Sequence, residues 1–224
     1  LQGRKLRHTY RFVIAPETIG MLAYISQNEK AVKALAGGYA INTCGSFDVP
    51  SYKASFRGDA EIDTAVRLAF RDAGLQYKEH DWDAAGSDER QYATPGLRIP
   101  IGSIHRSKYY DYPEYHTSKD DLSIVSADRI ESVVDLYLAA IENLEFDRVY
   151  KSLCPIGEPM LSKRGLYQTI GGANGTDEAH SAIRWQAQAA GEWTMDIAEQ
   201  SGLKTSALDE AGRKLVAAGL LKEL

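Results

Sequence analysis

The sequence predicts a three-layer α/β sandwich with a mostly parallel sheet, followed by a linker and a small helical domain. Short apolar runs alternate with segments of helical spacing over the first part of the chain, which is typical of a parallel sheet covered by helices. Glycine and proline become frequent after Glu145, and three short helical patterns follow. These observations place the first domain at residues 1–150, the linker at 151–165 and the small domain at 166–224.

The predicted strands are apolar runs bounded by turn-forming or polar residues. Residues 10–15 are expected to form a buried strand, because the run is apolar and ends at Pro16. The run at residues 52–56 is expected at an edge of the sheet. The remaining strands are predicted at residues 38–44, 77–82 and 99–104.

Helical spacing of apolar residues predicts helices at residues 18–35, 60–73 and 127–144. Asp59 and Ser126 are the expected caps of the second and third helices, since short polar side chains accept hydrogen bonds from the free amides at a helix start. The faces expected to point inward comprise Ile19, Leu22, Ala23 and Ile25; Ile62, Ala65, Val66, Ala69 and Phe70; and Ile130, Val133, Val134, Tyr137, Leu138 and Ile141.

Composition narrows the function classes. The net charge of −5 argues against a large nucleic-acid surface, which needs a basic field. No apolar run is long enough to span a membrane, and the amino-terminal residues lack the apolar core of a signal peptide. Cys44 and Cys154 are expected to be reduced thiols, so a cytoplasmic protein is expected. Homo-oligomerisation stays open.

The last three helical patterns, at residues 177–190, 194–200 and 205–218, have the rhythm of a helix-turn-helix, with a tight turn at residues 201–203. From residue 177 to the end, five basic minus eight acidic residues give a charge of −3. This is the wrong sign for a surface that follows phosphates. A packing or interaction role is therefore expected from this domain in preference to DNA binding.

Polar loops flank the apolar run at residues 99–104. His116 follows Pro113 and should lie on an extended loop after this strand. Asp120 and Asp121 are close enough in sequence to orient an imidazole that is bound to metal. A surface histidine in a polar loop is the alternative interpretation.

Further candidates lie near the ends of the predicted strands. Glu17 is either a catalytic carboxylate or a loop carboxylate, and Asp88 with Glu89 could equally cap a helix. Because parallel strands gather their carboxyl ends at one edge of a sheet, Glu17, Asp88 and His116 are expected to converge on one cleft. Arg106 could bind a substrate carboxylate or be a solvated charge. Tyr115 belongs to a tyrosine run that lines a cleft or covers a sheet edge.

Four segments resemble those of bacterial aminopeptidase-like proteins that carry the DUF4910 domain. The segments are PETIG at residues 16–20, SDERQY at 87–92, RSKYYDYPEYHTSKDDL at 106–122 and KRGLY at 163–167. YPEYHTSKDDL is a long and specific match, whereas PETIG alone is weak. The resemblance runs from about residue 10 to the carboxyl end. It implies a place in the clan of M28 zinc peptidases and a carboxyl-terminal winged-helix domain.

The resemblance also implies roles for individual residues. In M28 peptidases a strand ends in a Glu-Glu pair, of which the first is the general base and the second binds metal. Glu17 resembles the first, and Thr18 stands in the place of the second. His116 matches the zinc-binding histidine of the His-Thr-x-x-Asp motif and Asp120 matches its Asp. Asp88 resembles the Asp of a Ser-Asp-His segment beside the metal site.

Two parts of the family pattern are missing from the chain. Residues 41–43 offer no carboxylate where a further metal ligand is expected. The His-Pro-x-x-x-Asn-Asp segment, which supplies a histidine and an aspartate ligand, would precede residue 10. The expectation is therefore the carboxyl-terminal portion of an M28-like domain, with one zinc ion completed by ligands not in this chain. Such a portion should bind zinc weakly and show little activity alone.

Two functions from different classes follow. The first is a zinc-dependent aminopeptidase-like hydrolase of peptide or amide bonds, acting on a small peptide-like substrate, with Glu17 accepting the proton of the attacking water. The second is a non-catalytic interaction module with a degenerate peptidase fold, whose winged helix serves assembly. Zinc content separates the two.

Overall fold

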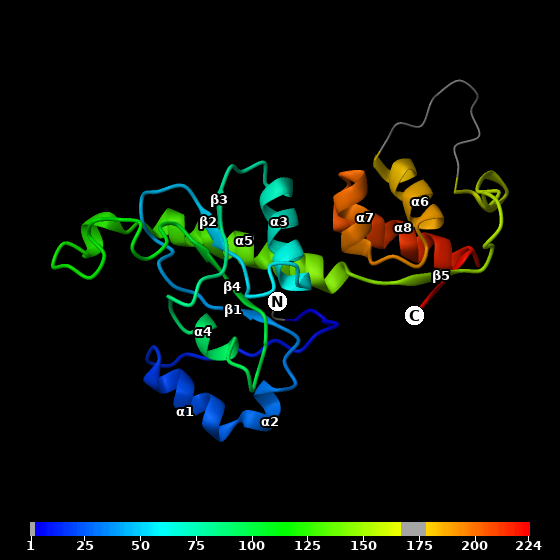
Figure 1. Cartoon of the computed structure of the whole chain (residues 1–224). Helices are drawn as coiled ribbons and strands as arrows, with labels where there is room; N and C mark the ends of the chain where they lie inside the picture. Colours follow the sequence, from blue (N-terminus) through cyan, green and yellow to red (C-terminus); the bar gives the residue numbers. More distant parts are fainter. Residues whose placement is uncertain (1–2, 167–177) are drawn as a thin grey trace. The chain divides into compact units, whose positions relative to one another are not determined.

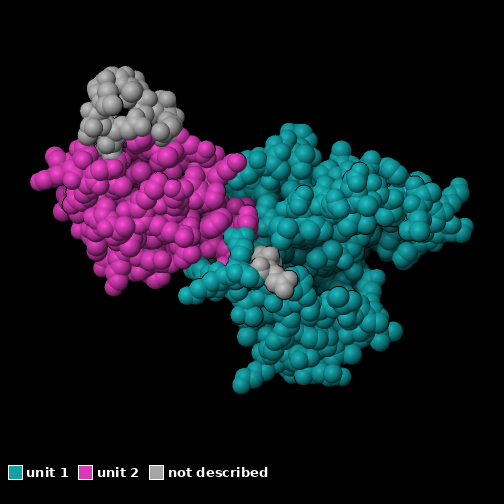
Figure 2. Space-filling view, turned by 180° about the vertical axis from the view of Figure 1, so that it is seen from behind, with its two compact units in different colours: residues 1–141 teal, residues 142–224 magenta. Residues whose placement is uncertain are grey.

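The computed structural model describes residues 3–166 and 178–224, and the chain separates into two compact units, residues 1–141 and 142–224 (Figure 2). Each unit has its own core and is described by itself. The glycine-rich run at residues 171–175, which predicts a flexible turn, and the last residue of the KRGLY segment lie outside the described residues. No described helix is long and apolar enough to cross a membrane.

Unit 1 is built on a four-stranded mixed sheet of strand order β1-β4-β2-β3 (Figure 1). β1 pairs with β4 and β2 with β3 in parallel, whereas β2 and β4 run antiparallel. The strands are β1 (Gly38–Tyr39), β2 (Ser51–Lys53), β3 (Lys78–His80) and β4 (Ile101–His105). The predicted mixed α/β fold with a mostly parallel sheet is confirmed.

The prediction of an edge strand at residues 52–56 was wrong. β2 lies between β4 and β3, and all of its residues are buried. Its side chains alternate between two covered faces, as successive strand residues must. Tyr52 reaches Asp63 of α3 (Glu61–Asp72), and Lys53 reaches Glu89 of α4 (Glu89–Tyr92). Lys53 is fully buried, although lysine is normally solvated.

α3 confirms the predicted helix and its inward face, but not the predicted cap. The N-cap residue is Ala60, and the buried carboxylate of Asp63, three residues on, accepts from the Ala60 N–H at 2.9 Å. The same carboxylate accepts from the Tyr52 hydroxyl at 2.6 Å and the Ser55 N–H at 2.8 Å. Asp59 instead pairs with Arg57 at the surface. Asp63 therefore starts α3 and ties it to β2.

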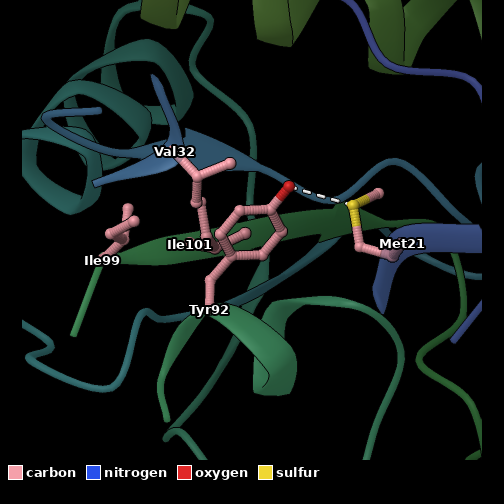
Figure 3. Close-up of a cluster of buried hydrophobic side chains, with 5 residues drawn as sticks. All are labelled: Met21, Val32, Tyr92, Ile99 and Ile101. Atoms are coloured by element: carbon pink, nitrogen blue, oxygen red, sulfur yellow. Dashed lines mark hydrogen bonds between the residues drawn. The ribbon is translucent and has the colours of Figure 1, made fainter. Parts of the chain in front are cut away.

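A buried apolar cluster joins four elements on one side of the sheet (Figure 3). Its members come from α1 (Ile19–Gln27), α2 (Glu29–Val32), α4, and the start of β4 with the residues just before it. Figure 3 shows the Tyr92 hydroxyl directed at Met21 Sδ, a contact of 2.9 Å. The cluster comprises Met21, Val32, Tyr92, Ile99 and Ile101.

The predicted inward face of residues 18–35 was wrong. α1 buries Met21, whereas Ile19 is 80% exposed and Leu22 is also exposed. Almost every residue of α1 is apolar, so several faces fit a helical spacing equally well. In addition, the predicted single helix is broken at Asn28 into α1 and α2, and the second short helix fixes the orientation by burying Val32.

The predicted strand at residues 10–15 is also absent. Phe12 is 73% exposed and Ile14 fully exposed, while Val13 packs against the cluster of Figure 3. A strand requires hydrogen bonds to a neighbouring strand, and none of the described strands pairs with this segment. Apolar composition alone could not show whether such a partner is present.

α5 (Ala127–Phe146) follows the short 3₁₀ helix Leu122–Ile124 and confirms the predicted long helix. Val133, Tyr137 and Ile141 are buried as predicted, whereas Ile130, Val134 and Leu138 are at least 38% exposed. The Tyr137 hydroxyl accepts from the Ile104 N–H at 2.8 Å. It thus fixes α5 to β4 in unit 1.

Beyond the end of α5, the described residues of unit 2 form three α-helices, a short 3₁₀ helix and a two-stranded antiparallel sheet. Gly202, at φ 73°, ends α7 (Thr194–Ser201) and forms the predicted tight turn before α8 (Thr205–Ala217). β5 (Tyr150–Ser152) pairs with β6 (Leu221–Glu223), so the predicted linker begins inside a strand. The other elements are the 3₁₀ helix Ser162–Arg164 and α6 (Glu178–Gln188).

Candidate active site

A hydrogen bond joins the segment that carries Glu17 to the turn that carries Asp88. The backbone N–H of Thr18 donates to Asp88 Oδ1 at 2.8 Å. A weaker contact of 3.4 Å runs from the Arg90 guanidinium to the Thr18 hydroxyl. Thr18 lies just before α1 and Asp88 just before α4. The structure therefore places the predicted site residues Glu17 and Asp88 in one region.

The surroundings of the Asp88 carboxyl group raise its pKa. Burial raises the pKa of Asp88, and the negative charges of Glu17 and Glu89 raise it further. The N–H of Thr18 and the charge of Arg90 oppose this rise without cancelling it. A carboxyl group with a raised pKa exchanges its proton closer to neutral pH than an exposed aspartate does.

His116 lies exposed in the loop between β4 and α5, the green segment at the left of Figure 1. Its imidazole stacks on the Tyr115 ring, with 4.0 Å between ring centroids. Burial raises the pKa of Tyr115, and the charges of Tyr110, Glu17 and Asp120 raise it further.

Strained backbone conformations mark the same segments. Thr18, Tyr110 and His116 have φ angles of 60°, 68° and 58°. Thr43, in the segment where the resemblance expected a carboxylate, has φ 45°. A residue with a Cβ in such a conformation costs roughly 1–3 kcal/mol, and such residues gather at functional sites. The strain thus coincides with the segments proposed from the sequence.

The remaining predicted residues have the following partners. Asp120 Oδ2 accepts a hydrogen bond from the Tyr112 hydroxyl at 3.2 Å, so this carboxylate contacts a tyrosine of its own loop. The Arg106 guanidinium contacts the Ser132 hydroxyl at 3.5 Å, and burial followed by the charge of Arg129 lowers its pKa. Arg106 therefore faces α5.

A complete zinc site does not fit within the described parts of the chain. A catalytic zinc takes three protein ligands. Among residues 3–166 and 178–224, no group of three His, Cys, Asp or Glu side chains is placed to hold a metal ion. His116 is the residue that the resemblance matches to a zinc ligand, and one imidazole is too few.

A hollow of about 570 Å³ lies beside α4. Arg90 and Arg98 both line it, and neither forms an ion pair within the described part of unit 1. Arg98 is also strained, with φ 53°. The other lining residues are Trp82, Ala84, Gln91, Ala93, Thr94 and Pro95. The hollow adjoins the candidate site through Arg90, whose guanidinium contacts Thr18.

Sequence reasoning missed a buried polar cluster of Lys53, Glu89 and Tyr109. Lys53 Nζ contacts Glu89 Oε1 at 3.0 Å and the Tyr109 hydroxyl at 2.6 Å. The Tyr109 hydroxyl also donates to Glu89 Oε1 at 2.9 Å. All three side chains are nearly or fully buried. The sequence feature that could have indicated this cluster was a lysine inside a predicted strand. In the structure this lysine lies next to the Ser-Asp-Glu turn, although the two are distant in sequence.

Comparison with known proteins shows the family to which this chain belongs. Residues 1–147 match the domain of unknown function DUF4910, and residues 148–223 match a winged helix-turn-helix domain. A Clostridium acetobutylicum protein, named as a candidate polysaccharide biosynthesis protein with an aminopeptidase-like domain, is 36% identical over 224 residues. That match covers 99% of this chain and 51% of the relative, so the chain spans about half the length of the curated relative.

A solved structure shares the fold along nearly the whole chain. The crystal structure of a candidate peptidase from Clostridium acetobutylicum superposes with a TM-score of 0.86 at 33% identity, covering 99% of this chain and 50% of that one. An aminopeptidase from Aneurinibacillus sp. strain AM-1 covers 56% of this chain and 30% of its own, at 19% identity and a TM-score of 0.45. The match over residues 1–147 exceeds half of the chain. The chain therefore belongs to the DUF4910 domain family and continues into a winged helix-turn-helix domain.

Proposed function

We propose that this chain forms part of a zinc-dependent aminopeptidase-like hydrolase of peptide or amide bonds, in the clan of M28 zinc peptidases. The observation that carries the proposal is the hydrogen bond from the Thr18 N–H to Asp88, which brings Glu17 and Asp88 together. The relationship to a protein with an aminopeptidase-like domain supports the same reaction class. In this proposal the α/β unit belongs to a three-layer sandwich, and ligands outside this chain complete the zinc site beside His116.

Each residue has a distinct role in the proposed reaction. Glu17 accepts the proton of the attacking water, as a positioned carboxylate can. Asp88, whose pKa is raised by burial, donates a proton to the leaving amine and is reprotonated by the proton that Glu17 took from the water. His116 supplies one metal ligand, and Asp120 supports the loop that carries it. Tyr115 and Arg106 are proposed contacts for the substrate.

The proposed substrate is a small peptide or another amide. The hollow beside α4 is lined by the guanidinium groups of Arg90 and Arg98, which suit a negatively charged substrate group. Nucleic acid is not a proposed partner, because the helical patterns after residue 177 carry a charge of −3. The two free cysteines support a cytoplasmic location, and burial raises the pKa of Cys44 to about 11, which makes it a poor nucleophile.

The test uses a chimera in which this chain replaces the matching half of the clostridial relative. Hydrolysis of aminoacyl p-nitroanilides should fall roughly 10²–10⁴-fold on Glu17→Gln, the range for loss of a general base. Glu114→Gln, the same chemical change two residues from His116, should leave turnover unchanged. Full activity of the Glu17→Gln chimera would contradict the assignment.

A further inference from the structure

Lys53 is a lysine side chain that unit 1 buries completely. It lies on β2, where its neighbour Tyr52 faces α3 and the ammonium faces the opposite side. Lysine is among the residues least often found fully buried, because removing its charge from water is costly unless partners compensate. The groups that contact Lys53 Nζ therefore show which segments of unit 1 its charge holds in place.

The first set of partners surrounds Asp88. Lys53 Nζ donates to the carbonyl oxygen of Ala85 at 2.6 Å and to Glu89 Oε1 at 3.0 Å. The same carboxylate oxygen accepts from the Ser87 N–H at 3.2 Å. These contacts hold the turn before and after Asp88, the residue that bonds to Thr18.

The second set of partners leads to His116. Lys53 Nζ lies 2.6 Å from the Tyr109 hydroxyl, which donates in turn to Glu89 Oε1. The Tyr109 ring contacts the Tyr115 ring, with 6.5 Å between centroids. Tyr115 stacks on the His116 imidazole. A continuous chain of contacts thus runs from the buried ammonium to the exposed histidine.

Gly86 shows how closely these groups are packed. A Cβ at this position would lie 2.1 Å from Glu89 Oε1, 2.3 Å from the Tyr109 hydroxyl and 2.9 Å from Lys53 Nζ. Its φ angle of 146° is one that residues with a Cβ rarely adopt. The backbone of the turn therefore lies directly against the three polar groups, and the turn moves if they move.

We propose that Lys53 is a positioning residue, which holds the turn of Asp88 and the loop of His116 in one fixed arrangement. This role rests on the proposed function in one respect only, which is that the Asp88 turn and the His116 loop form the site. Lys53 touches neither the Asp88 carboxylate nor the His116 ring, so it acts through Glu89 and Tyr109. Removing its charge should release both segments together.

The experiment follows the two segments separately by NMR in the full chain. The reporters are the ring signals of His116, assigned by their loss in His116→Asn, and the carboxyl titration of Asp88, assigned by Asp88→Asn. Lys53→Met should move the His116 signals away from their stacked position and shift the Asp88 titration midpoint. Tyr109→Phe should move the His116 signals more than the Asp88 midpoint, because the bonds from Lys53 to Ala85 and Glu89 remain.

The matched control is Tyr52→Phe. Tyr52 lies on the same strand as Lys53 but points to the opposite face of the sheet. The substitution removes the hydrogen bond from its hydroxyl to the buried carboxylate of Asp63. Both reporters should stay at their wild-type positions in this variant. If Tyr52→Phe moves them as far as Lys53→Met does, general loosening explains the result and the inference is wrong. Unchanged reporters in folded Lys53→Met would also overturn it.

A second variant keeps the test decisive if Lys53→Met fails to fold because Glu89 is left buried without a partner. Lys53→Met with Glu89→Gln removes both charges and should restore folding while leaving the two segments released. Wild-type reporter signals in this double variant would contradict the inference. In the chimera, Lys53→Met should lower kcat more than it changes KM. If the parent chimera shows no hydrolysis, the proposed function is wrong. The NMR experiment still tests the positioning role of Lys53 in that case.

Discussion

Lowering the pH to about 5 should destabilise unit 1, because β4 buries a neutral histidine. His105 is completely buried, and its Nδ1 lies 2.7 Å from the Thr43 hydroxyl. Its Nε2 has no hydrogen-bond partner among the described residues. Burial lowers the pKa of His105 to about 4, with the charges of His80 and Lys53 acting in the same direction and Glu89 opposing them.

The magnitude follows from the difference between the folded and unfolded chains. The pKa of an unperturbed histidine is about 6.5, so the unfolded chain takes up a proton as the pH falls below that value, while the folded chain does not until about pH 4. The stability is thus fully present above pH 6.5 and is lost as the pH falls. Each pH unit in this window costs about 1.4 kcal/mol, which gives about 2 kcal/mol at pH 5.

The assay is urea unfolding at about pH 7.5 and about pH 5, followed by tryptophan fluorescence. Trp185→Phe with Trp193→Phe leaves Trp82 as the reporter, and Trp82 lies in unit 1. His105→Gln cannot take up a proton, so its stability should depend less on pH, by about 2 kcal/mol over this interval. Equal losses in the two proteins would refute the reasoning.

Two further predictions concern packing and charge. Gly86→Ala should destabilise unit 1 by roughly 2 kcal/mol or more, because the backbone is strained and the added Cβ contacts Glu89 and Tyr109. The control is Gly58→Ala, which is also at positive φ but has open space around it. The same Trp82 assay should show a smaller loss of stability for this control. Asp209→Asn should destabilise unit 2 by about 2–3 kcal/mol, since it weakens the ion pair of this buried carboxylate with Arg148. Unfolding followed by the two tryptophans of unit 2 measures this, and an unchanged urea midpoint would contradict it.

The helices were predictable where amphipathic spacing was unambiguous. α3 buries the stripe that its sequence predicts, including Ile62, Val66 and Phe70, because charged residues occupy its other face. α1 lacks such contrast, so its inward face could not be chosen from spacing. Residues 10–15 have a strand-like composition, yet strand formation depends on a partner that composition cannot show.

The candidate site was predictable only in part. Motif resemblance selected Glu17, Asp88 and His116, and the structure links the first two through the hydrogen bond from Thr18 to Asp88, whereas His116 stacks on Tyr115 in a separate loop. Lys53 could not be selected, because a single lysine in a strand is normally solvated. Its burial results from the approach of two segments that are distant in sequence. Such long-range contacts are properties of the fold and not of a local pattern.

The most direct test of the proposed function is the metal content and aminopeptidase turnover of two proteins, this chain and the chimera with the clostridial relative. The chain alone should hold well under one zinc per molecule and show little turnover, because the described residues provide no three-ligand site. The chimera should hold one zinc and hydrolyse aminoacyl p-nitroanilides, and His116→Ala should abolish both properties while leaving the fold intact. Stoichiometric zinc with robust turnover in the chain alone, or an active His116→Ala chimera, would contradict the account.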